Sequence, residues 1–382
     1  MADPAPPVRD GDGDGNGDGA RAPDDAIGIA LSGGGYRAML FHAGAIVRLY
    51  ETGLLGRAAR ISSVSGGSIT SAKLALEWPR VTSRDALFGH VVEPIRRMAG
   101  TGIDVSAVLG GVFLPGSVGD RVAAAYARHL FGDATLQDLP VAPVFVINAT
   151  NVETGSLWRF SRARARDWQV GEIAAPRLRL ADAVTASSAF PPVLSPFVLK
   201  VGPADFTTVE AGVDASFLRD IALTDGGVYD NLGLETVFKR CRTLFVSNGG
   251  AALARDGSPA SDWLGHTRRI IDIIDNQVGD VRTRQLIETL KLDDANPLHR
   301  RGAYWGIGGD AGSLGLPDSL PAPLARTREL AATPTRLSAM PAALQERLMN
   351  WGYVACDAAV RRWYPAGGPY RAPALPYPAN PI

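Results

Sequence analysis

The stretch Arg60-Ile61-Ser62-Ser63-Val64-Ser65-Gly66-Gly67-Ser68-Ile69 decides the fold of this chain. A short apolar run enters it and an amphipathic run from Ile69 to Leu76 leaves it, which predicts a buried strand turning sharply into a helix. The residues near the apex must be small because neighbouring backbone comes close. Ser65 would expose its hydroxyl at a helix N-terminus, where backbone N–H groups favour a developing alkoxide. We therefore predict that Ser65 is a nucleophile.

Composition limits the class of protein. The chain has 382 residues, 46% of them hydrophobic, which is enough for a sizeable core. Its formal net charge is zero, so nothing global points to a nucleic-acid partner. The two cysteines, Cys241 and Cys356, suit neither a disulfide framework nor a thiolate zinc cluster, and they favour a reducing compartment. We expect a cytoplasmic protein without a metal ion.

The N-terminus has no apolar signal core, and no stretch of about 18 apolar residues occurs. We therefore expect no transmembrane segment, and any membrane contact should be peripheral.

Both ends of the chain are expected to lie outside the folded domain. Residues 1–25 are rich in Asp, Gly, Pro and Ala and are predicted to be disordered. Their alternating Gly and Asp lack the Glu and the flanking helices of an EF-hand. Residues 365–382 are rich in proline and are predicted to be extended.

Strands alternate with helices through residues 26–364. This alternation predicts a three-layer α/β/α sandwich with a mostly parallel central sheet. The expected strands are Ile27–Leu31, Arg60–Val64, Val144–Thr150 and Thr243–Asn248. The expected helices are Tyr36–Leu54, Ser83–Met98, Val118–Phe131, Leu180–Ala189, 268–291 and one within Leu337–Tyr364.

A glycine loop, Ser32-Gly33-Gly34-Gly35, joins the first strand to the first helix. The spacing Gly33-x-Gly35-x-x-Ala38 matches a dinucleotide fingerprint, which also needs an acid at the end of the next strand. That strand ends in serines, and Glu51 lies within or at the end of the helix. Alternatively, the loop donates backbone N–H groups to an oxyanion, as acyl transfer requires. Because the next strand leads to Ser65, we favour the oxyanion loop and expect no cofactor.

A second glycine turn follows the apolar run Ala222-Leu223-Thr224 and reads Asp225-Gly226-Gly227. Such a turn can present a carboxylate, although Asp-Gly-Gly by itself is most often an ordinary surface turn. Sites in parallel α/β sheets form beyond the carboxyl ends of strands. We therefore expect the glycine loop, Ser65 and Asp225 to converge.

Taken in order, Ser-Gly-Gly-Gly-Tyr-Arg (32–37), Ser-Val-Ser-Gly-Gly (63–67) and Asp-Gly-Gly (225–227) resemble the motifs of the patatin-like phospholipases. The resemblance covers roughly residues 26–250. It implies the patatin-like fold and a serine–aspartate dyad that hydrolyses lipid esters at a membrane surface. In that dyad Ser65 matches the nucleophile, and Asp225 matches the base that takes its proton directly.

The resemblance also implies roles for other residues. The oxyanion loop would be Gly33, Gly34 and Gly35, with Arg37 helping to hold the charge. Gly66, Phe190 and Pro191 are assigned to substrate binding.

One residue departs from the family pattern, because the turn usually opens with a glycine and here Ser63 takes that place. A backbone angle reserved for glycine would strain this serine. Ser62, Ser63 and Ser68 are also rival hydroxyls, but of these four serines Ser65 alone is followed by two glycines.

Other readings stay open at this point. His266 and His299 follow Asp225, so chain order permits a Ser-His-Asp esterase. A non-catalytic effector that binds a lipid or nucleotide is the third possibility.

A run of arginines could form either a solvated strand edge or a contact for an anionic lipid. Its members are Arg159, Arg162, Arg164, Arg166, Arg177 and Arg179. Neither the lipid class nor the oligomeric state follows from the sequence.

Overall fold

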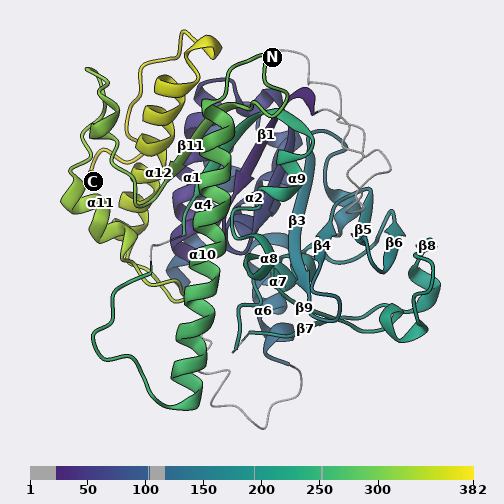
Figure 1. The fold of residues 1–382 in the computed structure, drawn as a ribbon. Coiled ribbons are helices and arrows are strands. Elements are labelled where there is room, and N and C mark those ends of the chain that lie inside the picture. Colours follow the sequence, from purple (N-terminus) through teal and green to yellow (C-terminus); the bar gives the residue numbers. More distant parts are fainter. Residues whose placement is uncertain (1–22, 102, 104–116, 193, 251–252) are drawn as a thin grey trace.

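A run of parallel strands in the order β11-β10-β1-β2-β3 forms the centre of the fold (Figure 1). The computed structural model describes residues 23–101, 103, 117–192, 194–250 and 253–382. The strands are β1 (Asp24–Leu31), β2 (Ala58–Val64), β3 (Val144–Asn151), β10 (Cys241–Asn248) and β11 (Arg301–Gly306). Each reads as a largely buried run because helices cover both faces of the sheet.

Beyond β3 the sheet becomes antiparallel. The outer strands are β4 (Leu157–Phe160), β5 (Arg164–Asp167), β6 (Gly171–Ala174) and β8 (Thr208–Val209). Two further strands, β7 (Phe197–Leu199) and β9 (Ile221–Asp225), pair with each other.

Strand β9 positions one half of the site, because it also pairs with β3, in the antiparallel sense. Along one edge of β3, Val64 of β2 lies opposite Asn148, and Asp225 of β9 lies opposite the next residue, Ala149. On the other edge, Ala149 pairs with Trp158 of β4. Strands β2 and β9 therefore point at each other along the same edge of β3, and the chain leaves the sheet where they meet.

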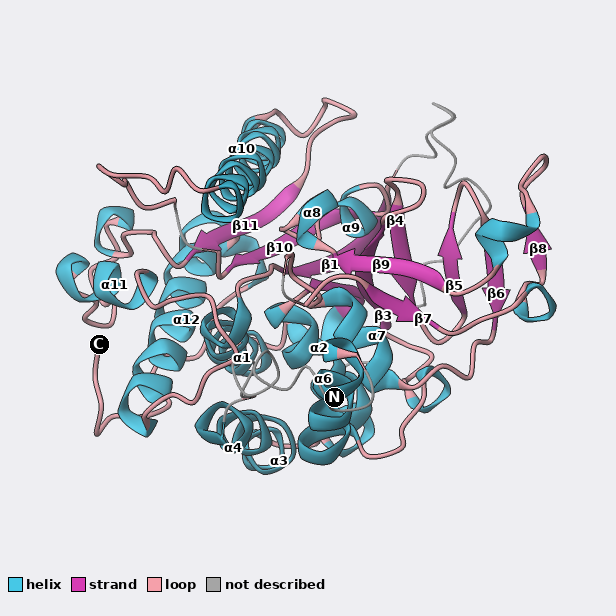
Figure 2. Cartoon of the chain, turned by 90° about the horizontal axis from the view of Figure 1, so that it is seen from below, coloured by secondary structure: helices cyan, strands magenta, loops and turns pink. Residues whose placement is uncertain are grey.

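The helices form a layer on each face of the sheet (Figure 2). One face carries α8 (Gly227–Asp230), α9 (Glu235–Phe238) and α10 (Trp263–Lys291). The other carries α1 (Gly35–Glu51), α2 (Gly66–Glu77), α6 (Val118–Tyr126), α7 (Leu180–Ser187) and α12 (Ala342–Trp363). This arrangement confirms the predicted three-layer α/β/α sandwich with its mostly parallel sheet around the central strands.

Several predicted boundaries differ from the structure. The helix expected at Ser83–Met98 is interrupted by a π-helical turn at Phe88–Val92, which separates α3 (Arg84–Leu87) from α4 (Glu93–Thr101). The helix expected at 268–291 already begins at Trp263. A further short helix, α11 (Leu324–Ala331), precedes α12. Of the predicted disordered tail, residues 1–22 lie outside the described residues, and β1 begins at Asp24.

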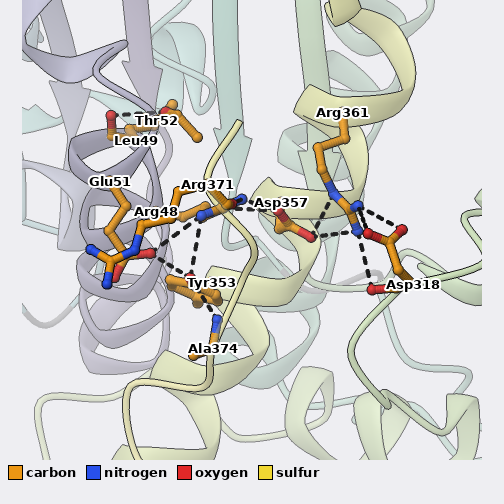
Figure 3. A network of polar contacts seen from close by, with 10 residues as sticks. All are labelled: Arg48, Leu49, Glu51, Thr52, Asp318, Tyr353, Asp357, Arg361, Arg371 and Ala374. Carbon is orange, nitrogen blue, oxygen red and sulfur yellow. Dashed lines mark hydrogen bonds and ion pairs between the residues drawn. The ribbon is translucent and has the colours of Figure 1, made fainter. Parts of the chain in front are cut away.

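The C-terminal segment 365–382 has little regular structure, and it is fastened to α1 and α12 (Figure 3). Arg48 of α1 donates from Nε to Oδ1 of Asp357 on α12 at 2.8 Å, and from Nη2 to the carbonyl of Arg371 at 2.7 Å. The amide of Ala374 donates to the hydroxyl of Tyr353 at 3.1 Å. The ion pair is almost fully buried, since the side chains of Arg48 and Asp357 are 0% and 1% exposed.

Breaking this buried pair should be costly. We expect Asp357→Asn to lower the free energy of unfolding by about 3 kcal/mol, because it removes the nearest carboxylate from the buried Arg48 and leaves Glu51, at 3.3 Å, as its remaining carboxylate partner among the described residues. Asp318, an exposed partner of Arg361, provides the control, and Asp318→Asn should leave the free energy of unfolding close to that of the wild type. Urea denaturation of both variants measures the difference, and equal losses would contradict the assignment.

Candidate active site

The turn from β2 into α2 places Ser65 at its apex. Ser65 has φ 50° and ψ −121°, a backbone conformation that residues other than glycine rarely adopt. Such conformations cost about 1–3 kcal/mol and cluster at active sites. A Cβ added to the next residue, Gly66, would lie 2.1 Å from the carbonyl oxygen of Gly35, so only glycine lets this turn approach the glycine loop.

The strain considered for Ser63 is found at Ser65 instead. Ser63 belongs to β2, and its hydroxyl donates to the carbonyl of Val146 at 3.3 Å while it accepts from Ser68 at 3.1 Å. Ser68 is within 2.9 Å of the Ser187 hydroxyl, and Ser62 accepts hydrogen bonds of its own. The three rival hydroxyls are therefore engaged inside the protein. Of these four serines, Ser65 alone lines the cleft described below.

Asp225 ends β9 and is buried, with 2% of its surface exposed. Its Oδ1 accepts a hydrogen bond from the Gly227 amide at 2.7 Å, whereas Oδ2 has no partner in full hydrogen-bond geometry. Burial raises the pKa of Asp225 to about 7, against the lowering effects of the Gly227 amide and the nearby Ser65 side chain. The negative charge of Asp275 raises it further. A carboxyl with this pKa could accept a proton near neutral pH, and its Oδ2 is the oxygen that the Gly227 amide leaves uncommitted.

The end of α7 ties Ser65 and Asp225 together, a role that the sequence did not reveal. The Ser187 hydroxyl accepts a hydrogen bond from the Ser65 amide at 3.0 Å and donates to the Asn148 carbonyl at 2.6 Å. The Ser187 carbonyl accepts from Gly226 at 3.2 Å. These bonds hold the turn after β2 and the turn after β9 against the same strand.

The glycine loop lies beside this pair at the start of α1. Gly34 and Gly35 have φ values of 136° and 60°, which favour glycine, and both line the cleft. Their backbone amides donate no hydrogen bond to another described residue, as expected for the first amides of a helix. The Gly33 amide instead donates to the carbonyl of Asn231 at 2.9 Å, and Gly33 does not line the cleft. Gly34 and Gly35 are therefore the candidate oxyanion donors.

Arg37 is buried beside this loop and also lines the cleft. Its Nε donates to the carbonyl of Gly249 at 3.1 Å, and its Nη1 donates to the carbonyl of Thr333 at 2.5 Å. Burial lowers its pKa to about 10, so the guanidinium stays charged at neutral pH. It brings a positive charge to the glycine loop and links that loop to the loops at Gly249 and Thr333.

The cleft has a volume of about 1320 Å³. Of the residues assigned to catalysis or substrate binding from the sequence, Ser65, Asp225, Phe190 and Pro191 line it, whereas Gly66 does not. Its apolar lining includes Ile103, Phe190, Pro191, Pro192, Leu194, Leu232, Leu253, Ile307 and Leu337. Its polar lining from α10 includes Arg268, Arg269, Asp272, Asp275, Asn276, Asp280 and Thr283.

The other sequence candidates lie elsewhere. Neither His266 nor His299 lines the cleft. His299 precedes β11 and therefore lies at the amino ends of the parallel strands, away from the carboxyl ends where the cleft is. Its Nδ1 lies 3.0 Å from Oδ1 of Asp294. None of the six arginines in the run from 159 to 179 lines the cleft either. Several contact protein atoms instead, as Arg164 does in its 3.0 Å ion pair with Glu172.

Asn231 is a second residue that sequence reasoning missed. It lines the cleft, and its Oδ1 would lie 2.2 Å from a Cβ on Gly33 and 2.9 Å from one on Gly227. One side chain therefore fills the space between the glycine loop and the Asp-Gly-Gly turn. Its place six residues after Asp225 was the only available signal, and spacing alone does not predict this contact.

Comparison with known proteins bears on the fold and the family of this chain. No curated protein sequence matches the chain. The structure is similar to human GIVD cytosolic phospholipase A2 with a TM-score of 0.52 and 14% identity, covering 88% of this chain and 61% of that one. It is also similar to that protein in complex with methyl gamma-linolenyl fluorophosphonate, with a TM-score of 0.51, 16% identity and coverage of 88% and 58%.

The chain thus spans less than two thirds of these structures, and at this identity they support the fold alone. A sequence model of the patatin-like phospholipases matches residues 29–238, which is more than half of the chain. The match includes the glycine loop from Gly33, the Ser65 turn and the Asp-Gly-Gly turn. The chain therefore belongs to the patatin-like phospholipase family.

Proposed function

We propose that this protein is a lipid acyl hydrolase that works through a serine–aspartate dyad. Ser65 attacks the carbonyl carbon of a carboxylic ester, and Oδ2 of Asp225 takes the hydroxyl proton. The observation that carries the proposal is the meeting of β2 and β9, which delivers both residues to one cleft with the carboxyl tuned to about neutral pH. Asp225 is thus a better base than an exposed carboxylate would be.

The remaining steps use the same groups. The tetrahedral intermediate carries its negative charge toward the amides of Gly34 and Gly35, near the positive charge of Arg37. When the ester bond breaks, the alcohol leaves with the proton held by Asp225, and Ser65 keeps the acyl group. Water then attacks this acyl-enzyme, Asp225 takes a proton from the water, and the fatty acid is released as Ser65 regains its proton.

Two observations favour a lipid as the ester. Family membership points to phospholipid hydrolysis, and the cleft combines an apolar lining with room for a long acyl chain. In the described part of the chain, no helix is both long and apolar enough to cross a membrane. We propose that the substrate is reached at a membrane surface, because a phospholipid substrate is held in a bilayer. Product analysis of mixed bilayers treated with the wild type or Ser65→Ala would separate phospholipid from neutral-lipid hydrolysis.

A fluorophosphonate probe with a fatty chain tests the nucleophile directly. Such probes phosphonylate an activated serine, so peptide mapping should find the label on Ser65, and Ser65→Ala should remain unlabelled. If the wild type bound lipid but was never labelled, a non-catalytic effector would replace the hydrolase.

The double variant His266→Ala, His299→Ala distinguishes the dyad from a triad. We expect it to keep most of the esterase activity, because neither histidine reaches the cleft. A loss as deep as that of Ser65→Ala would instead establish a histidine as the base.

The acid limb of the pH profile reports on Asp225. We expect kcat/KM for a soluble ester to fall about tenfold per pH unit below pH 7, because only ionised Asp225 accepts the proton. Asp275→Asn removes a negative charge that opposes this ionisation, so its acid limb should move to lower pH. Asp280→Asn is the control, since Asp280 also lines the cleft but should leave the limb in place. An unmoved limb in Asp275→Asn would contradict the coupling.

A further inference from the structure

Between residues 263 and 281, helix α10 exposes apolar side chains on the side that faces away from the protein. Trp263, Ile270, Ile274 and Val281 are 82%, 41%, 58% and 54% exposed. At 100° per residue these four positions fall within about 40° of one another on the helix. They form one strip, which we call the α10 strip.

The opposite side of α10 is polar and lines the cleft. Asp272, Asn276 and Thr283 lie roughly 180° from the α10 strip and are cleft residues. An ordinary surface helix does the reverse, with its apolar side on the core and its polar side in water. An inverted helix therefore indicates that something other than water covers its outer side.

The two halves of α10 are held differently, since the N-terminal half is hydrogen-bonded to the loop at Leu253 and Ala254 and the C-terminal half packs on the core. Leu286, in its C-terminal half, is fully buried in a cluster with Val237, Leu244 and Val246. Arg282 also holds that half through a 3.0 Å ion pair with Glu235. In Figure 1 the N-terminal half of α10, which carries most of the strip, extends below the ends of the central strands. This is the end of the sheet at which β1 and β2 lead to the glycine loop and Ser65.

We propose that the α10 strip is the surface by which this protein docks on a lipid bilayer. The proposal rests on the lipid acyl hydrolase function proposed above. A helix that lies in the interfacial region buries one apolar side among the lipids, and Trp side chains favour that depth. Because the other side of α10 is a wall of the cleft, docking would hold the cleft beside the lipid that enters it.

The size of the strip favours a bilayer over a second copy of the chain. From Trp263 to Val281 it is about 27 Å long and one helix, or about 10 Å, wide. This covers a few hundred Å², whereas each partner in a stable dimer buries about 800 Å². A bilayer needs no matching surface, so a single helix face is enough to bind it.

Binding to vesicles tests this surface. The test uses the full chain with Ser65→Ala, so that no products accumulate, and co-sedimentation with phosphatidylcholine vesicles. We expect the added pair Ile270→Ser, Ile274→Ser to weaken partitioning roughly 30-fold, because it removes apolar area that the bilayer would bury. Since the strip itself carries no charge, raising the salt from 0.05 to 0.5 M should change partitioning less than about twofold.

The matched control is Leu298→Ser. Leu298 is 62% exposed, but it precedes β11 and lies at the amino ends of the parallel strands, far from the carboxyl ends and the cleft. This variant should therefore bind vesicles like the parent. Equal binding by the Ile270/Ile274 pair and the parent would overturn the proposal. So would a dimer in sedimentation equilibrium that the pair dissociates, because a second copy would then cover the strip.

Activity separates this inference from the proposed function. With Ser65 present, the Ile270/Ile274 pair should hydrolyse a water-soluble short-chain ester at the parental rate but vesicle lipid roughly 30-fold more slowly. Equal losses on both substrates would overturn docking in favour of damage to the cleft. If the parent bound vesicles through the strip but hydrolysed no ester, docking would stand and the proposed function would fail.

Discussion

Replacing Ser65 with alanine is expected to lower ester hydrolysis by at least about 10⁴-fold while the protein stays folded. The reaction loses the oxygen that forms the acyl-enzyme, whereas the oxyanion donors and the cleft remain. Alanine also carries a Cβ, so the backbone strain at φ 50° is similar in both proteins and stability should change little. Initial rates with a soluble ester, together with a thermal melt, measure both effects.

The neighbouring serines supply matched controls. Ser63→Ala and Ser68→Ala remove hydroxyls that are bonded within the protein, so each should lower stability by about 1 kcal/mol but keep substantial activity. Ser65→Gly should be as inactive as Ser65→Ala and more stable by about 1 kcal/mol or more, because glycine adopts this backbone freely. Ser65 would be rejected as the nucleophile if Ser65→Ala hydrolysed the ester at the wild-type rate. It would also be rejected if Ser63→Ala lost activity and Ser65→Ala did not.

The turn at Ser65 and the glycine loop could be predicted from short stretches of sequence, because each is formed by residues that are adjacent in the chain. The apolar run before Ser65, the two glycines after it and the helical spacing beyond are enough to specify a strand, a turn and a helix. The same holds for the glycine loop between β1 and α1. Both elements were expected from short-range patterns, and the three-layer sheet followed from their alternation.

The geometry around Asp225 depends on long-range pairing. The sequence shows a strand before Asp225, but not that β9 runs against β3 and meets β2 end to end. The hydrogen bond between the Ser65 amide and the Ser187 hydroxyl, and the packing of Asn231 against Gly33, also join residues far apart in the chain. Side chains such as serine and asparagine form hydrogen bonds in many settings, so their type alone does not predict a partner.

Helix α10 shows the same limit in another way. Its length was approximately predicted, but an apolar strip in a sequence is normally assigned to the core. Only the positions of Leu286 and of the cleft residues reveal that the strip from Trp263 to Val281 faces outward.

Replacing Asp225 with asparagine should reduce kcat about 10³-fold or more, because asparagine cannot take the proton from Ser65. The substitution keeps the shape of the side chain and an oxygen for the Gly227 amide, which now donates to Oδ1 at 2.7 Å. The amide nitrogen replaces Oδ2, the oxygen without a partner, and can donate to the Ser65 hydroxyl. The expected defect is therefore in proton transfer rather than in folding.

Stability should change in the opposite direction to activity. The pKa of Asp225 is about 7 in the folded protein, against an ordinary value of 3.8. Between these values the folded state binds more protons than the unfolded state, so the wild type loses stability as the pH rises through this window. Asp225→Asn removes that loss and should be more stable by up to about 4 kcal/mol at pH 8, but not below pH 3.8.

Urea denaturation at pH 8 and at pH 3.5 tests this sign directly. Asp220→Asn is the matched control, because Asp220 lies in the bend immediately before β9 but is exposed, and asparagine tolerates its φ of 47°. It should change neither activity nor the pH dependence of stability. If Asp225→Asn were inactive and also less stable at pH 8, Asp225 would be a structural residue, because a buried base that serves catalysis is held at a cost to the fold.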